Sequence, residues 1–167
     1  MKQNSMFGVW CAGWLCVACG SSGEDSGGAV AASALEGTIE GTAFKAQSAI
    51  GSYYGSDGTM SISIYDTAVN CETRPPEAAR YILLSVPWKA NSQRDFSLKF
   101  DDDGQTATFV IDAGGKTNNI LATEGRVEIL DAPVEVGLEG TIRLRAIARE
   151  NEVEGAIQVR ICRTPDF

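Results

Sequence analysis

The stretch Glu139-Gly140-Thr141-Ile142-Arg143-Leu144 decides the fold of this chain, because polar and apolar side chains alternate along it. The same Glu-Gly opening recurs at residues 124–129 and 154–159, at a spacing of 15 residues both times. A period of two is that of a half-buried β-strand, and fifteen residues accommodate one strand and its turn. The pattern predicts a C-terminal β-meander whose glycines permit bulges or bends. Apolar residues keep one phase from 134 to 144, which predicts a long strand bent at Gly140.

Alternating apolar rows also occupy residues 60–64, 82–86, 96–100 and 107–111. Glycine-rich and aspartate-rich turns separate these rows, as expected for antiparallel hairpins. The chain is therefore expected to be all-β, with about eight or nine strands. An antiparallel β-sandwich is the predicted architecture, and a small β-barrel is the alternative.

The N-terminus carries Lys2, a polar stretch, and an apolar segment that ends in Leu15-Cys16-Val17-Ala18-Cys19. This anatomy is that of a signal peptide, and the apolar segment is shorter than the about 20 residues that a spanning helix needs. The segment resembles the type II signal peptide of bacterial lipoproteins, although Cys16 stands where that family usually has leucine. The resemblance implies cleavage before Cys19 and lipidation of that residue. Ordinary secretion, with cleavage after Ala18, is the alternative.

The resemblance divides the chain into three parts. Residues 1–18 are the expected signal peptide, residues 19–34 form a Gly, Ser and Ala linker, and residues 35–167 form the β-domain. A flexible linker of this length spans roughly 20–25 Å. Gly20, rather than aspartate, follows the lipidated cysteine, which by the family's sorting rule implies the outer membrane. Residues 35–163 also loosely resemble small β-sandwich lipoproteins of Gram-negative bacteria.

Two further cysteines, Cys71 and Cys162, remain in the expected exported domain. Exported proteins fold in an oxidising environment, so these two are expected to form a structural disulfide. A redox or metal-binding role is the competing interpretation. Cys71 and Cys162 do not form a Cys-x-x-Cys motif, and the chain has no histidine to support such a role.

The composition excludes several function classes. With 14 basic and 22 acidic residues the net charge is −8, which opposes binding to nucleic acids or anionic lipid surfaces. The absence of histidine removes the common nucleophile–base pairs. Gly114-Gly115-Lys116-Thr117 lacks the first glycine of a nucleotide-binding loop, and Asp101-Asp102-Asp103 lacks the alternation of a calcium loop. No enzyme activity, cofactor, metal or nucleotide is predicted.

Three tyrosines are candidate ligand-binding residues. Tyr53, Tyr65 and Tyr81 fall outside the apolar phase of their expected strands, so outward-facing rings that hold a sugar or peptide are predicted. The leading hypothesis is an outer-membrane lipoprotein with a non-catalytic binding or assembly domain, whose partners are the membrane and envelope proteins or glycans. The alternatives are a carbohydrate-binding module or weak carboxylate glycosidase, and a purely structural envelope component.

Overall fold

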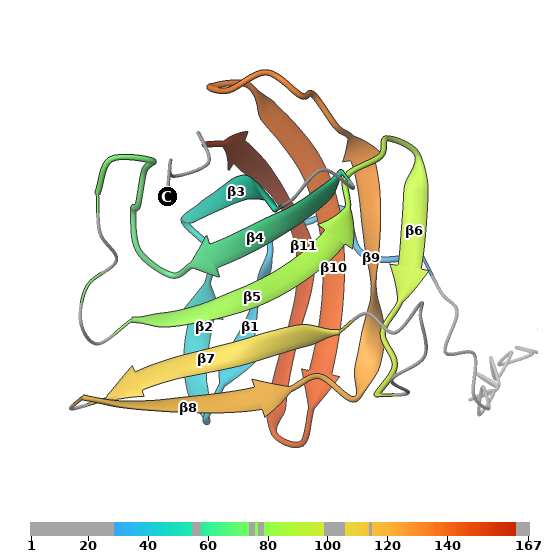
Figure 1. The fold of residues 1–167 in the computed structure, drawn as a ribbon. Coiled ribbons are helices and arrows are strands. Elements are labelled where there is room, and N and C mark those ends of the chain that lie inside the picture. Colours follow the sequence, from blue (N-terminus) through green and yellow to red (C-terminus); the bar gives the residue numbers. More distant parts are fainter. Residues whose placement is uncertain are drawn as a thin grey trace, which may run out of the picture.

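The computed structural model describes residues 29–54, 58–73, 76, 79–98, 106–113 and 115–162. These residues form strands and connections without a helix, as Figure 1 shows, so the predicted all-β class is confirmed. The strands of the described part are β1 (Glu36–Ile39), β2 (Thr42–Lys45), β3 (Ser48–Tyr54), β4 (Thr59–Tyr65), β5 (Arg80–Pro87), β6 (Ser92–Asp95), β7 (Ala107–Ala113), β8 (Lys116–Leu121), β9 (Glu124–Asp131), β10 (Glu139–Ala148) and β11 (Asn151–Ile161).

The strands make one mixed sheet in the order β6-β9-β10-β11-β3-β4-β5-β7-β8, and the β1–β2 hairpin branches from β11. This sheet curls on itself into a half-barrel, which corresponds to the barrel-like alternative (Figure 1). The predicted C-terminal meander is present as β9, β10 and β11. The pairing of β11 with β3 is parallel, which the expectation of a fully antiparallel fold did not include. The strand count exceeds the predicted eight or nine because β1, β2 and β6 have only four residues each.

The core lies inside the curl and is built from the alternating rows predicted over residues 60–64, 82–86 and 107–111. The strand predicted over residues 96–100 is wrong for its described part, because β6 ends at Asp95 and Leu98 is 43% exposed, although Phe96 is buried. On β4, Met60, Ile62 and Ile64 have no exposed surface, while Ser61 and Ser63 between them are partly exposed. Such strictly inward rows fix the register, because a slip of one residue would turn every apolar side chain to solvent. The hairpin β1–β2 adds Ile39 and Phe44 to the same core.

The long strand predicted over residues 134–144 is interrupted. The strand β10 begins at Glu139, and from Ile142 onward its apolar row is buried. Val134 and Val136 precede the strand in a connecting loop and are 70% and 61% exposed. The apolar alternation extends through residues 134–138, but these residues are not part of the sheet. The chain turns near Gly137, which has a φ of 90°.

Glycines of the recurring Glu-Gly pattern mark places where two backbones come close. Gly155 has a φ of +142°, and a Cβ there would lie 2.5 Å from the carbonyl oxygen of Ala34. A Cβ on Gly37 would lie 2.0 Å from the carbonyl oxygen of Glu152. Both sites lie where the chain enters β1 alongside β11, so the glycines permit the branch of the sheet.

The ordered domain begins earlier than predicted, because residues 30–34 are part of the fold. Val30 is only 4% exposed. The Ala156 N–H donates to the Ser33 oxygen at 2.6 Å, and the Leu35 N–H donates to the Ala156 oxygen at 3.0 Å. The last residues assigned to the linker are therefore bound to the sheet.

Asn151 connects two hairpin turns and is the one fully buried polar side chain among the described residues. Its Oδ1 accepts the Glu40 N–H at 2.7 Å, and its Nδ2 donates to the Ala148 oxygen at 3.0 Å. Glu40, in the β1–β2 turn, has a φ of 49°. The amide thus holds this strained turn against the start of β11.

Candidate functional site

A fork in the pairing of β11 creates the candidate site. One edge of β11 pairs with β10 along its whole length. The other edge pairs with β1 up to Glu154 and with β3 at Arg160 and Ile161. Because β1 and β3 diverge, the residues Ile157–Val159 have no strand partner on that edge within the described part.

A groove of about 430 Å³ lies at this fork, and we call it the fork groove. Its lining combines apolar side chains with neutral polar side chains and one ion pair. The apolar lining consists of Ala46, Ala49, Val69, Ala156 and Ile157. The polar lining consists of Gln47, Ser48, Asn70 and Gln158, together with Glu139 and Arg160.

The charges of the fork groove neutralise each other. The guanidinium of Arg160 donates to one carboxylate oxygen of Glu139, from Nη2 at 2.8 Å and from Nε at 3.1 Å. These two side chains are 52% and 37% exposed, so the pair contributes little to stability. The pair does affect the electrostatics of the groove, because the two opposite charges cancel and a ligand meets no net charge.

Two of the polar lining residues are used by the fold. Ser48 Oγ donates to the Thr67 oxygen at 2.7 Å and accepts the Val69 N–H at 3.0 Å. Asn70 Oδ1 accepts the N–H groups of Glu72 and Thr73. These bonds shape the loop after β4, which forms one wall of the groove.

The glutamines Gln47 and Gln158 are exposed, and neither side chain bonds to another described residue. Each carboxamide offers two N–H donors and one carbonyl acceptor. Isolated glutamines carry no motif, so the sequence pattern does not indicate them as site residues. A neutral ligand with hydroxyl or amide groups matches this lining.

The predicted disulfide is present beside the groove. Cys71 and Cys162 are joined, with a Cα–Cα distance of 5.4 Å. A smaller hollow of about 220 Å³, lined by Asn70, Cys71, Glu72 and Arg160, adjoins the fork groove there. The bridge therefore ties the loop wall of the groove to the end of β11.

The structure corrects the predicted exposure of Tyr65. This side chain is only 5% exposed and lies directly opposite Tyr81 on β5, with ring centroids 5.2 Å apart. The next residue in the same cross-strand row is Val110, which is also buried. The outer face of β4, β5 and β7 thus carries a second apolar layer, which sequence alternation alone does not reveal. Burial raises the pKa values of both tyrosines.

Tyr53 is also placed differently from the prediction. It pairs with the fully buried Met60 and packs against the core at the end of the inward row. Its hydroxyl is buried without a hydrogen-bond partner in the structure, and burial raises its pKa. The three tyrosines therefore form no common exposed row, and none of them lines the fork groove.

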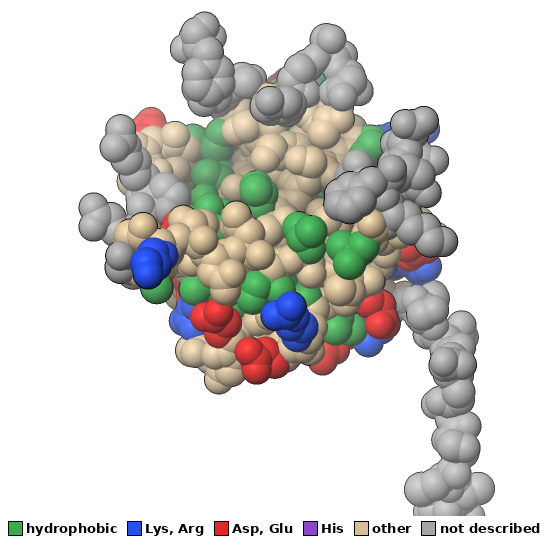
Figure 2. Space-filling model, turned by 60° about the horizontal axis from the view of Figure 1, so that its bottom comes forward, with side chains coloured by type: hydrophobic (Ala, Val, Ile, Leu, Met, Phe, Trp, Pro, Cys, Tyr) green, Lys and Arg blue, Asp and Glu red, His purple; other side chains and the backbone are tan. Residues whose placement is uncertain are grey.

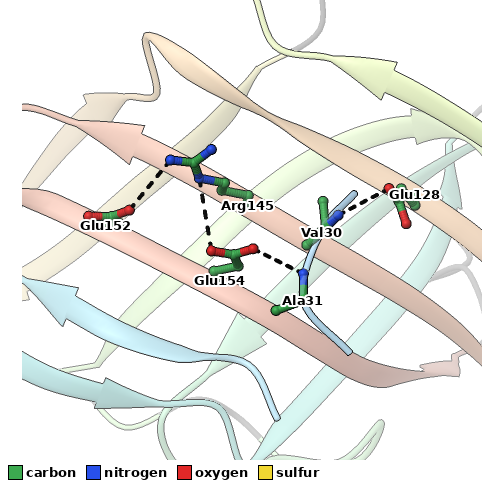
Figure 3. A network of polar contacts seen from close by, with 6 residues as sticks. All are labelled: Val30, Ala31, Glu128, Arg145, Glu152 and Glu154. Carbon is green, nitrogen blue, oxygen red and sulfur yellow. Dashed lines mark hydrogen bonds and ion pairs between the residues drawn. The ribbon is translucent and has the colours of Figure 1, made fainter. Parts of the chain in front are cut away.

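Carboxylates on the C-terminal strands bind the segment of chain that precedes β1. Figure 3 shows Glu154 between Arg145 and the N–H of Ala31, which donates to its carboxylate at 3.0 Å. Glu128 accepts the Val30 N–H at 3.3 Å in the same way. These carboxylates fix the end of the linker on the outer face of β9, β10 and β11.

Other predicted features have more limited outcomes. Cys19 and Asp101-Asp102-Asp103 lie outside the described residues. The described residues hold no group of three or more metal-ligating side chains, and no helix among them could span a membrane. On the face in Figure 2, acidic and basic side chains of the described part are interspersed.

No family model, curated protein or solved structure matches this chain.

Proposed function

We propose that this protein is an exported lipoprotein, anchored by Cys19 in the outer membrane, whose β-domain binds a neutral polar ligand without catalysis in the fork groove. The main support for this proposal is the positions of the cysteines in the sequence. Cys19 follows a signal-like apolar segment, and the only two cysteines beyond it form a disulfide. Stable disulfides are typical of exported proteins.

Because residues 30–34 are attached to the sheet, only residues 19–29 separate the proposed anchor from the attached part of the chain. The linker reaches the domain on the outer face of β9, β10 and β11. The lipid anchor thus holds the domain close to the membrane and leaves the opposite face of the barrel, with β4 and β5, away from the attachment point (Figure 1).

The neutral lining supports the choice of ligand class. The Glu139–Arg160 pair cancels the formal charge, and the carboxamides of Gln47 and Gln158 remain available for hydrogen bonds. A glycan or a peptide backbone offers matching hydroxyl or amide groups. The described lining has no aromatic ring, so hydrogen bonding rather than stacking would hold a sugar.

Metabolic labelling with palmitate tests the anchor. The wild-type protein should incorporate the label and stay with the membrane fraction, while Cys19→Ala should lose both properties. Cys16→Ala is the matched control, because it alters a cysteine of the same segment and should still be labelled. An unlabelled wild type, or loss of label in both variants, would disprove lipidation at Cys19.

Titration with two neutral probes tests the groove. Amide chemical shifts of the protein are followed with an uncharged oligosaccharide and with blocked tetra-alanine. The proposal expects shifts at the groove residues for at least one probe, and loss of these shifts in Gln158→Ala. Gln93→Ala, an exposed glutamine on β6, is the control and should retain them. If neither probe shifts these residues, the binding function fails and a purely structural role is favoured.

A further inference from the structure

The end of β9 and its connection to β10 expose an unusual number of apolar side chains. Of the six large apolar side chains exposed in the described part, four lie within residues 130–138, which we call the apolar segment. They are Leu130, Val134, Val136 and Leu138, with exposures of 37%, 70%, 61% and 47%. Such a concentration on a surface marks an interaction site more often than a packing requirement.

The backbone of this segment is held in place. Trp88 Nε1 donates to the Pro133 oxygen at 2.8 Å, and the Gly137 N–H donates to the Ile161 oxygen at 2.8 Å. The Ile161 N–H donates in turn to the Leu138 oxygen at 2.9 Å. A segment fixed in this way presents its side chains before a partner arrives, which lowers the ordering cost of binding.

Acidic side chains border the apolar segment and indicate what could cover it. Asp131, Glu135 and Glu139 are exposed, and only Glu139 is joined to a basic side chain, that of Arg160. Asp131 and Glu135 make no ion pair with the described residues. A second copy of this segment, or an anionic lipid surface, would bring like charges together, which opposes association. A basic protein surface would bring opposite charges.

We propose that the apolar segment docks a protein that presents an apolar groove bordered by lysine or arginine. This interaction is separate from ligand binding in the fork groove, and it depends on the proposed function only for the compartment in which the partner occurs. Val134 and Val136 enter the partner's groove, and Asp131 and Glu135 face its basic border.

Site-specific photocrosslinking in the native envelope tests the docking. A photoreactive residue replaces Val136 in the full-length chain, and Leu121, the last residue of β8, is the control position. In Figure 1, β8 lies at the end of the half-barrel opposite the connection between β9 and β10. Leu121 is comparably apolar and 42% exposed. The proposal expects one dominant heterologous adduct from position 136 and none of that mass from position 121. The crosslinked partner peptide should contain basic residues.

Charge reversal then tests the chemistry of the contact. Glu135→Lys should lower the adduct yield at least tenfold, whereas Glu150→Lys, in the turn after β10, should leave it unchanged. Thermal unfolding verifies that each variant is folded. No adduct, equal adducts from both positions, an adduct between two copies, or flotation with phosphatidylcholine vesicles that requires Val136 would each overturn the proposal. Palmitate labelling of the same cells shows whether the anchor itself has failed.

Discussion

Replacement of Asn151 by alanine tests how the two hairpin turns are held together. The change removes the acceptor of the Glu40 N–H and the donor to the Ala148 oxygen. Each buried polar group left without a partner costs about 1–3 kcal/mol. Water can reach Glu40, which is exposed, but not Ala148, which is 1% exposed. Only the Ala148 oxygen then stays without its partner, so we expect a loss of about 1–3 kcal/mol in the free energy of unfolding.

Chemical denaturation of the two forms measures this loss, and Asn119→Ala is the matched control. Asn119 is an exposed asparagine on β8, so its replacement should change the free energy of unfolding by less than about 0.5 kcal/mol. Hydrogen exchange at the Glu40 N–H should accelerate only in Asn151→Ala. If Asn151→Ala were as stable as Asn119→Ala, the two hydrogen bonds of the Asn151 side chain would not hold the turns together.

Three other perturbations follow from the same structure. The Cys71–Cys162 bridge closes a loop with a sequence separation of 91. Its reduction should therefore lower the free energy of unfolding by up to about 4.5 kcal/mol. A loss smaller than about 1 kcal/mol would contradict a stabilising role of the disulfide. Gly155→Ala should lower this free energy by at least about 2 kcal/mol, because both its φ and the close backbone oppose a Cβ; an unchanged denaturation midpoint would contradict that. The raised pKa values of Tyr65 and Tyr81 stabilise the fold below about pH 10, and this contribution is lost as pH rises through the folded-state values. Phenylalanine at both positions should flatten the alkaline fall in stability, and an unaltered fall would exclude these groups.

Much of the fold depends on local sequence patterns and could therefore be predicted from the sequence. Rows such as Met60, Ile62 and Ile64 identify strands by their period, and the Glu-Gly repeats locate the meander. The disulfide followed from counting the cysteines left after the expected signal segment. These features depend on residues close in sequence or on a single possible pairing.

The remaining features depend on contacts between distant segments. The parallel pairing of β11 with β3 joins residues more than a hundred positions apart, and no sequence period encodes it. The fork groove, lined by Gln47 and Gln158, exists only because of that pairing. The predicted exposure of Tyr65 is wrong because alternation indicates which face of the sheet a side chain lies on, but not whether other residues cover that face. Val134 and Val136 keep the core phase although the sheet ends before them.

The mass of the mature N-terminal peptide shows whether the protein is a lipoprotein. The proposed lipoprotein should yield a peptide that begins at Cys19 and carries a diacylglyceryl group on its sulfur and an acyl chain on its amine. The peptide from Cys19→Ala should lack both groups. An unmodified peptide that begins at Cys19, or one that begins at Met1, would contradict the proposed lipoprotein.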